Sequence, residues 1–402
     1  MGADSATAAI ALQPSLRHDL ATVKKPSKSD TTAAPERGQP GPTDAGLQRP
    51  PAEVLYADEL AKLRADDKLP RPPGWQLSPR AVRSFILGDQ KLGIRKKFVG
   101  HPSLVDRAMI ALATNRGLIL IGEPGTAKSL LSELLAAAIS GTSTLTIQGS
   151  AGTSEDQIKY TWNYALLLAE GPTARSLVPS PLYEGMRQGC IVRFEEITRC
   201  PLEIQDSLLA ALSDRVIAIP ELEQNKNLFA NVGFNIIATA NTRDLGVNEM
   251  SAALKRRFNF ETVFPIAQFD VELELVRAET KRGLERSGVP TMPGDDILEL
   301  LITTFRELRD GKTTEGQPLD RPTTAMSTAE AVSVAQAVGV RSYYLSGKAA
   351  TPSDLVECLV GAAVKTDKND GAILRRYFEQ RVAKKSGPHW KAYYEARHQL
   401  PE

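Results

Sequence analysis

The segment GLILIGEPGTAKSLLSELLAAAI, residues 117–139, constrains the fold more than any other part of the chain. It connects a short apolar run, typical of a buried strand, to a stretch whose apolar residues have helical spacing. A loop in this position can turn backbone N–H groups toward an anion, while its lysine and hydroxyl reach phosphates and Mg²⁺. We therefore predict a phosphate-binding loop formed by Gly122, Glu123, Pro124, Gly125, Thr126, Ala127, Lys128, Ser129 and Leu130.

Ala127 stands where such loops usually have glycine. Glycine is needed at that position only if φ is positive, a conformation that alanine tolerates poorly. We expect helical φ and ψ at Ala127 instead, so that the N-terminus of the following helix still faces the phosphates. On the loop alone, a Gly/Pro-rich turn that binds no ligand remains an alternative.

Length and composition limit the class of protein. A chain of 402 residues with 42% hydrophobic content can bury a sizeable core, and its net charge of +1 argues against a dedicated nucleic-acid or membrane-surface protein. The three cysteines, Cys190, Cys200 and Cys358, lack metal-ligand spacing and are expected to be reduced thiols. Since the sequence shows neither a membrane span nor an export signal, we expect a soluble, cytoplasmic protein.

The chain divides by composition into three parts. Residues 1–75 are rich in Pro and Ala and predict a disordered tail, with one short helix at VLYADELAKLRADD. Residues 76–265 alternate strand and helix patterns, which predicts an α/β nucleotide-binding core with a mostly parallel sheet between helices. The predicted strands are 117–121, 144–147, 190–194, 234–240 and 258–264. Residues 266–402 contain only helical patterns and predict a separate helical unit.

Two carboxylates, Glu195 and Glu196, follow the apolar strand CIVRF directly. An α/β sheet binds its ligand at the carboxyl edge, where these side chains emerge. We expect Glu195 to hold Mg²⁺ together with Ser129, and Glu196 to orient and deprotonate a water. Because aspartate is usual at position 195, the extra methylene suggests slow hydrolysis, and Glu195→Asp is expected to keep or raise activity. A solvated acidic turn is the alternative.

Two further candidates follow. Asn241 ends another apolar strand and could align a water against a γ-phosphate, although an Asn at a strand end is usually a turn residue. Arg256 and Arg257 follow a short helix in SAALKRRFNF. They either complement the helix C-terminus or reach a neighbouring subunit's nucleotide.

The order of these motifs resembles that of the AAA+ ATPases, and specifically their MoxR and dynein-related branch. GEPGTAKS is similar to the phosphate loop of that branch, in which alanine before lysine is ordinary. CIVRFEEITRC resembles its Walker B strand, FNIIATANTRD its sensor 1 and SAALKRRFNF its arginine-finger helix. The resemblance implies a P-loop AAA+ core, a C-terminal all-α lid, extra hairpins at 158–178 and 214–234, and bound ATP and Mg²⁺. It also implies a ring, commonly a hexamer, with ATP between subunits.

The resemblance also implies a function. We expect a MoxR-type ATPase that hydrolyses ATP in a ring to remodel, activate or assemble a partner, together with a protein that has a von Willebrand factor A (VWA) domain and with a protein client. The motor subunit of a McrB-type nuclease system is one alternative, and a slow nucleotide-binding switch or scaffold is another. The lid arginine that the family often has is replaced by Ala329, and Arg321 lies nearby in sequence.

Overall fold

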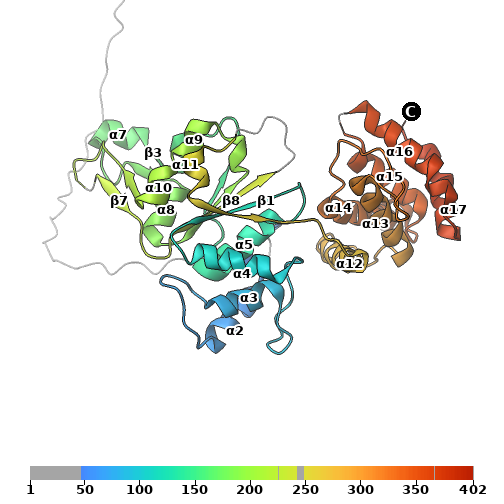
Figure 1. Cartoon of the computed structure of the whole chain (residues 1–402), viewed down its shortest axis with the longest axis horizontal. Helices are drawn as coiled ribbons and strands as arrows, with labels where there is room; N and C mark the ends of the chain where they lie inside the picture. Colours follow the sequence, from blue (N-terminus) through green and yellow to red (C-terminus); the bar gives the residue numbers. More distant parts are fainter. Residues whose placement is uncertain (1–46, 225, 242–248, 366, 402) are drawn as a thin grey trace, which may run out of the picture. The chain divides into compact units, whose positions relative to one another are not determined.

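The five apolar runs predicted as strands form one parallel sheet in the computed structural model, which describes residues 47–224, 226–241, 249–365 and 367–401 (Figure 1). The strand order is β2-β5-β8-β1-β9, and every neighbouring pair is parallel. The strands are β1 (Gly117–Gly122), β2 (Thr146–Gln148), β5 (Ile191–Glu195), β8 (Asn235–Asn241) and β9 (Phe258–Thr262). This arrangement confirms the predicted α/β core.

Helices pack on both faces of this sheet because its strands are apolar on both sides. Leu118 and Leu120 of β1 belong to one hydrophobic cluster, and Ile119 between them belongs to another. The first cluster includes residues of α3 (Pro79–Leu87), α4 (Pro102–Leu112) and α5 (Lys128–Ser140). The second includes residues of α6 (Glu155–Ile158), α8 (Pro181–Gln188), α10 (Leu209–Ser213) and α11 (Ala252–Lys255). Between α8 and α10 the chain forms α9 (Leu202–Asp206).

Two small antiparallel hairpins are inserted between these elements, as the resemblance implied. The first pairs β3 (Tyr160–Trp162) with β4 (Leu177–Pro179) and carries α7 (Tyr164–Glu170) in its connection. The second pairs β6 (Val216–Ala218) with β7 (Asn227–Phe229). Both lie outside the main sheet, so they do not change the strand order around the loop.

The ordered core begins well before the predicted boundary at residue 75. Helices α1 (Ala52–Leu55) and α2 (Ala57–Asp66) pack in the same cluster as α5, with Leu60 and Leu63 only 1% and 3% exposed. The composition concealed this packing because polar residues surround a few apolar residues at helical spacing. The short helix predicted at VLYADELAKLRADD is confirmed as α2, but residues 52–75 are not a disordered tail. The expected tail over residues 1–46 lies outside the described residues.

The helical unit after β9 has a hydrophobic core of its own. Its helices are α12 (Phe269–Arg286), α13 (Asp295–Asp310), α14 (Thr328–Arg341), α15 (Pro352–Ala363), α16 (Lys368–Gln380) and α17 (Pro388–Glu395). Phe305, Phe378 and Tyr393 are fully buried in this unit. Nowhere in the described ranges is a helix both long and apolar enough to cross a membrane.

Leu60→Ala tests whether the N-terminal helices are part of the core. Leu60 is 1% exposed, so its truncation should lower the free energy of unfolding by about 2–5 kcal/mol. Leu69→Ala is the matched control, because Leu69 is 42% exposed and should lose less than roughly 1 kcal/mol. Urea unfolding followed by circular dichroism measures both variants. Equal stabilities of the two variants would contradict the packing of α2 against the core.

Candidate functional site

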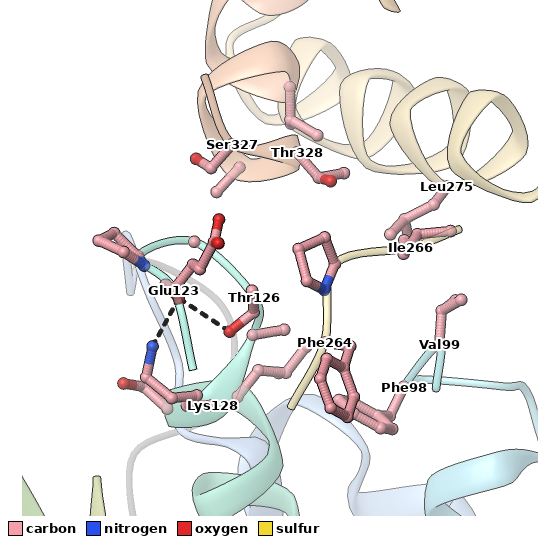
Figure 2. Close-up of a pocket in the computed structure, with 18 of the residues that line it drawn as sticks. Phe98, Val99, Glu123, Thr126, Lys128, Phe264, Ile266, Leu275, Ser327 and Thr328 are labelled. Carbon is pink, nitrogen blue, oxygen red and sulfur yellow. Dashed lines mark hydrogen bonds between the residues drawn. The ribbon is translucent and has the colours of Figure 1, made fainter. Parts of the chain in front are cut away.

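A cavity of about 420 Å³ lies between the phosphate loop and the first turn of α14. This volume is within the usual range for small-molecule sites. Figure 2 shows its two kinds of wall, with the loop and Ser327 and Thr328 on the polar side. The apolar side consists of Phe98, Val99, Phe264, Ile266 and Leu275.

The predicted loop is at this cavity. Residues 123–130 line it, whereas Gly122 ends β1 and does not. Lys128 begins α5, is buried, and its Nζ donates to the carbonyl oxygens of Gly122 at 3.1 Å and Glu123 at 2.7 Å. The Thr126 hydroxyl also donates to Glu123 O, at 2.9 Å (Figure 2). The loop therefore brings a lysine ammonium and a helix N-terminus to the same side of the cavity.

The prediction for the backbone of Ala127 is wrong. Ala127 has φ 66° and ψ 27°, which is the left-handed region, and Gly125 two residues earlier has φ 75°. An alanine in this region costs about 1–2 kcal/mol relative to its ordinary conformation. The loop requires this conformation nonetheless. Residues that alternate between left-handed and right-handed conformations point successive N–H groups into one concave site, which suits an anion. Glycine would therefore be the less strained residue at position 127.

Glu195 is buried and saturated with hydrogen bonds. Its Oε2 accepts from the hydroxyls of Ser129 at 2.6 Å and Thr239 at 2.8 Å. Its Oε1 accepts from Ser132 at 2.8 Å and from Arg193 at 2.7 Å. Burial alone would raise the pKa of Glu195, but the Ser129 hydrogen bond and the charge of Arg193 outweigh it and lower that pKa. The carboxylate is therefore held in its charged form.

The oxygen groups at this position fit Mg²⁺. The Ser129 hydroxyl and the Glu195 carboxylate are in contact at the start of α5, and hard oxygen donors are what Mg²⁺ prefers. Among the described residues there is no group of three or more His, Cys, Asp or Glu side chains arranged for a metal. A small cation bound at Ser129 and Glu195 would thus complete its coordination with water or with oxygens of a substrate.

Glu196 lines the cavity in a strained conformation. Its φ is 55° and ψ 44°, and its N–H donates to the Thr239 hydroxyl at 3.0 Å. The carboxylate forms an ion pair with Arg199, with 2.8 Å between Oε2 and Nε. Gly149 approaches the backbone so closely that an added Cβ would lie 2.3 Å from Glu196 O. The left-handed turn separates the two acids, so that Glu195 faces α5 while Glu196 faces the cavity.

Asn241 and the two arginines are at different ends of the sheet. Asn241 ends β8, pairs in register with Gly122 and lines the cavity. Phe258, directly after Arg257, pairs with Gly117 at the other end of β1. Five residues of a parallel strand span about 16 Å, so neither arginine can reach the cavity of its own chain. Arg257 bonds to Ser213 and to Ala253 O, whereas Arg256 is exposed.

An arginine of the C-terminal helical unit, which the sequence did not single out, also lines the cavity. Arg309 of α13 is buried and donates to both carboxylate oxygens of Glu272 at 3.0 Å. Glu272 also accepts from the Thr328 hydroxyl at 2.6 Å. Arg321, the nearby candidate, donates to Asp310 O and lies outside the cavity. The signal that was missed is the helical spacing of the buried residues in α13, which places Arg309 on the same face as Phe305.

Other residues of the site were missed because they come from apolar segments. Thr239 and Arg193 lie inside strands that were interpreted only as core, although a charged residue inside such a strand is itself a signal of a buried partner. The apolar wall comes from segments that lie before β1 and after β9 in the sequence. Spacing within one motif does not reveal such residues.

Comparisons with known proteins agree with this architecture. Residues 117–258 match the family model of the AAA domain (dynein-related subfamily), and residues 270–401 match that of the YehL-like AAA+ ATPase C-terminal domain. The chain is 62% identical over 364 residues to the uncharacterized protein YehL of Escherichia coli (strain K12), which covers 90% of this chain and 99% of that protein.

Two solved structures show more distant similarity. NtrX from Brucella abortus in complex with ADP is 15% identical with a TM-score of 0.45, over 75% of this chain and 64% of the NtrX chain. A putative ATPase from Cytophaga hutchinsonii is 15% identical with a TM-score of 0.37, over 75% of this chain and 87% of that chain. The family models and the relative at 62% identity establish that this chain belongs to the dynein-related AAA+ ATPases with a YehL-like C-terminal domain.

Proposed function

We propose that this chain binds ATP in the cavity beside the phosphate loop and hydrolyses it. The supporting observation is the convergence of a lysine, a hydroxyl and two carboxylates at one edge of the sheet, namely Lys128, Ser129, Glu195 and Glu196. Membership of the AAA+ ATPase family supports the same activity.

The cavity offers separate partners for the two ends of a nucleotide. Lys128 now bonds to two loop carbonyls, and its ammonium would exchange these for phosphate oxygens. The first turns of α5 and α14 both line the cavity, and helix N-termini favour anions. The apolar wall that includes Phe98 and Phe264 suits a base.

Hydrolysis would use the two groups that face the cavity at the strand ends. Glu196 would take a proton from the attacking water, and the Asn241 amide would orient that water. Mg²⁺ held at Ser129 and Glu195 would neutralise charge on the phosphates. The ion pair between Glu196 and Arg199 must open for the carboxylate to act as a base, because Arg199 Nε occupies its Oε2 at 2.8 Å.

We also propose that the chain acts in a ring and remodels a partner protein, together with a VWA-domain protein and a client. The family membership and the two inserted hairpins support this proposal. Arg256, exposed and beyond reach of its own cavity, is then the candidate that serves the neighbouring subunit. The Glu196–Arg199 pair favours a second candidate, a slow nucleotide switch, and steady-state ATP turnover discriminates the two.

Lys128→Ala and Glu196→Gln separate binding from hydrolysis. Lys128→Ala should abolish ATP binding, because it removes the cation that reaches the phosphates. Glu196→Gln should bind ATP like the wild type and lose at least roughly a hundredfold in turnover, since it removes the general base. Calorimetry and phosphate release measure these two properties, with the exposed Glu203→Gln as the control. Normal ATP affinity of Lys128→Ala would refute the proposed site.

Arg256→Ala tests the ring. An arginine supplied by a neighbour is worth about a thousandfold or more in other nucleotide hydrolases, so turnover should fall by that order. Arg257→Ala should retain most of its turnover, because its side chain is bonded within its own chain. Mixing Arg256→Ala with Lys128→Ala chains should restore part of the turnover, since a mixed interface joins an intact site to an intact arginine.

Two results would contradict the ring. One is a turnover per chain that stays constant down to dilutions at which light scattering finds only monomers. The other is normal turnover of Arg256→Ala at every protein concentration.

Gly149→Ala tests the backbone that supports Glu196. The added Cβ would lie 2.3 Å from Glu196 O, so the acid must shift and turnover should fall roughly tenfold to a hundredfold. Gly152→Ala is the control, because nothing lies within 4 Å of a Cβ built there. ATP affinity should be unchanged in both variants. Equal turnover of the two would show that the position of Glu196 does not limit hydrolysis.

A further inference from the structure

Strand β5 carries an arginine in the interior of the sheet. Arg193 is 8% exposed, and β5 lies between β2 and β8. It stands two residues before Glu195, so both side chains lie on the same face of the strand. Burying a guanidinium is costly unless its donors are satisfied, so this position requires an account from its contacts.

All parts of the Arg193 guanidinium have acceptors. These acceptors join β5 to the first turns of α5, to Ser143 before β2 and to Thr146 at the start of β2. Nε donates to Ser132 Oγ at 3.0 Å, one terminal nitrogen to Ser143 O at 3.1 Å and Thr146 Oγ1 at 3.4 Å, and the other to Ser129 O at 3.1 Å and Glu195 Oε1 at 2.7 Å. One nitrogen thus binds both the Glu195 carboxylate and the backbone of Ser129.

The two oxygens of Glu195 have different tasks in this arrangement. Oε1 is bound to Arg193 and Ser132, neither of which lines the cavity. Oε2 is left for the hydroxyls of Ser129 and Thr239. A glutamate has three side-chain torsions, and fixing Oε1 removes the freedom of the last of them. The orientation of Oε2 toward Ser129 therefore depends on what holds Oε1.

We propose that Arg193 is a positioning residue for the Mg²⁺-nucleotide site. It ties Oε1 of Glu195 to the first turn of α5, so that Oε2 stays on the Ser129 hydroxyl. This inference rests on the proposed nucleotide site and adds to it the residue on which its metal affinity depends. Arg193 itself does not touch the cavity.

Arg193→Met is the principal test, with fluorescent ADP as the probe. In EDTA the variant should bind the probe like the wild type, because the contacts of Arg193 do not include Lys128 or the loop residues before it. With MgCl₂ titrated in, the Mg²⁺ concentration for half of the metal-dependent change should rise about 10- to 100-fold, as when other groups that orient metal ligands are removed. Unchanged Mg²⁺ dependence would overturn the proposal.

A competing effect has the opposite sign, which makes the direction decisive. Without the positive charge of Arg193, the Glu195 carboxylate should by itself attract a cation more strongly. A lower Mg²⁺ requirement in Arg193→Met would therefore identify Arg193 as a charge counterweight and overturn its positioning role. Thr146→Val is the control, since it removes another contact of the same guanidinium without touching Glu195 and should leave the Mg²⁺ requirement unchanged.

Arg193→Lys keeps the test decisive if Arg193→Met does not fold. Lysine preserves the buried charge but, lacking the planar fork, cannot hold Glu195 Oε1, Ser132 and Ser143 together. The Mg²⁺ requirement should rise severalfold. A folded Arg193→Lys protein with the Mg²⁺ dependence of the wild type would overturn the proposal.

The structure also reverses the expectation that Glu195→Asp keeps or raises activity. A carboxylate one methylene shorter cannot reach both Arg193 and Ser129, and it leaves the guanidinium buried without its acceptor. Glu195→Asp alone should therefore need more Mg²⁺, and adding Arg193→Met should reduce that defect. A double variant that is worse than Glu195→Asp alone would contradict the coupling.

Failure of this inference is distinguishable from failure of the proposed function. If the wild type neither binds fluorescent ADP nor releases phosphate from ATP, the nucleotide site itself is wrong. If the wild type does both, and Arg193→Met and Arg193→Lys share its Mg²⁺ dependence, only the role of Arg193 is wrong.

Discussion

The register of three adjacent parallel strands, β5, β8 and β1, is the constraint on which the site depends. The register pairs Gly122 of β1 with Asn241 of β8, and Phe194 of β5 with Ala238 of β8. Glu195 consequently stands beside Thr239, which bonds both to its carboxylate and to the N–H of Glu196. A slip of one residue would turn each side chain to the other face. The apolar packing on both faces of the sheet therefore fixes the chemistry at its edge.

Buried ion pairs hold the groups around the cavity on both of its sides. Arg193 and Glu195 connect β5 to α5 in the core, and Arg309 and Glu272 connect α13 to α12 in the lid. Burial alone would raise the pKa of Glu272. The hydrogen bond and the charge of Arg309, together with the bonds from Thr328 and Arg306, outweigh burial and lower that pKa, so Glu272 is also charged. Such pairs add little net stability, yet losing one partner leaves a costly buried charge. Their contribution is to fix geometry, since each reaches a residue that lines the cavity, Ser129 or Thr328.

The parts of the fold that could be predicted are those encoded in contiguous patterns. The strands, the loop and the carboxylates after β5 each occupy one short segment, so periodicity and spacing located them. The packing of α2, the apolar wall and Arg309 depend on segments far apart in sequence, which no local pattern connects. The prediction of a helical backbone at Ala127 was wrong for a different reason. Its residue type favours a helical backbone, and only the closed loop around it imposes the left-handed one.

Two residues of the site have a strained backbone. Of the four non-glycine residues with positive φ in the described chain, two are Ala127 in the loop and Glu196 after β5. Each such residue costs about 1–3 kcal/mol and persists only when its surroundings determine it. Around Glu196 these surroundings are the Thr239 hydroxyl and the close approach of Gly149, whose N–H donates to Glu195 O at 2.7 Å. A relaxed, extended Glu196 would continue β5, and alternation would direct its side chain to the face opposite Glu195. The strained turn instead places Glu196 at the cavity, while Glu195 stays bound to Ser129 and Ser132 of α5. The two adjacent acids therefore have different surroundings.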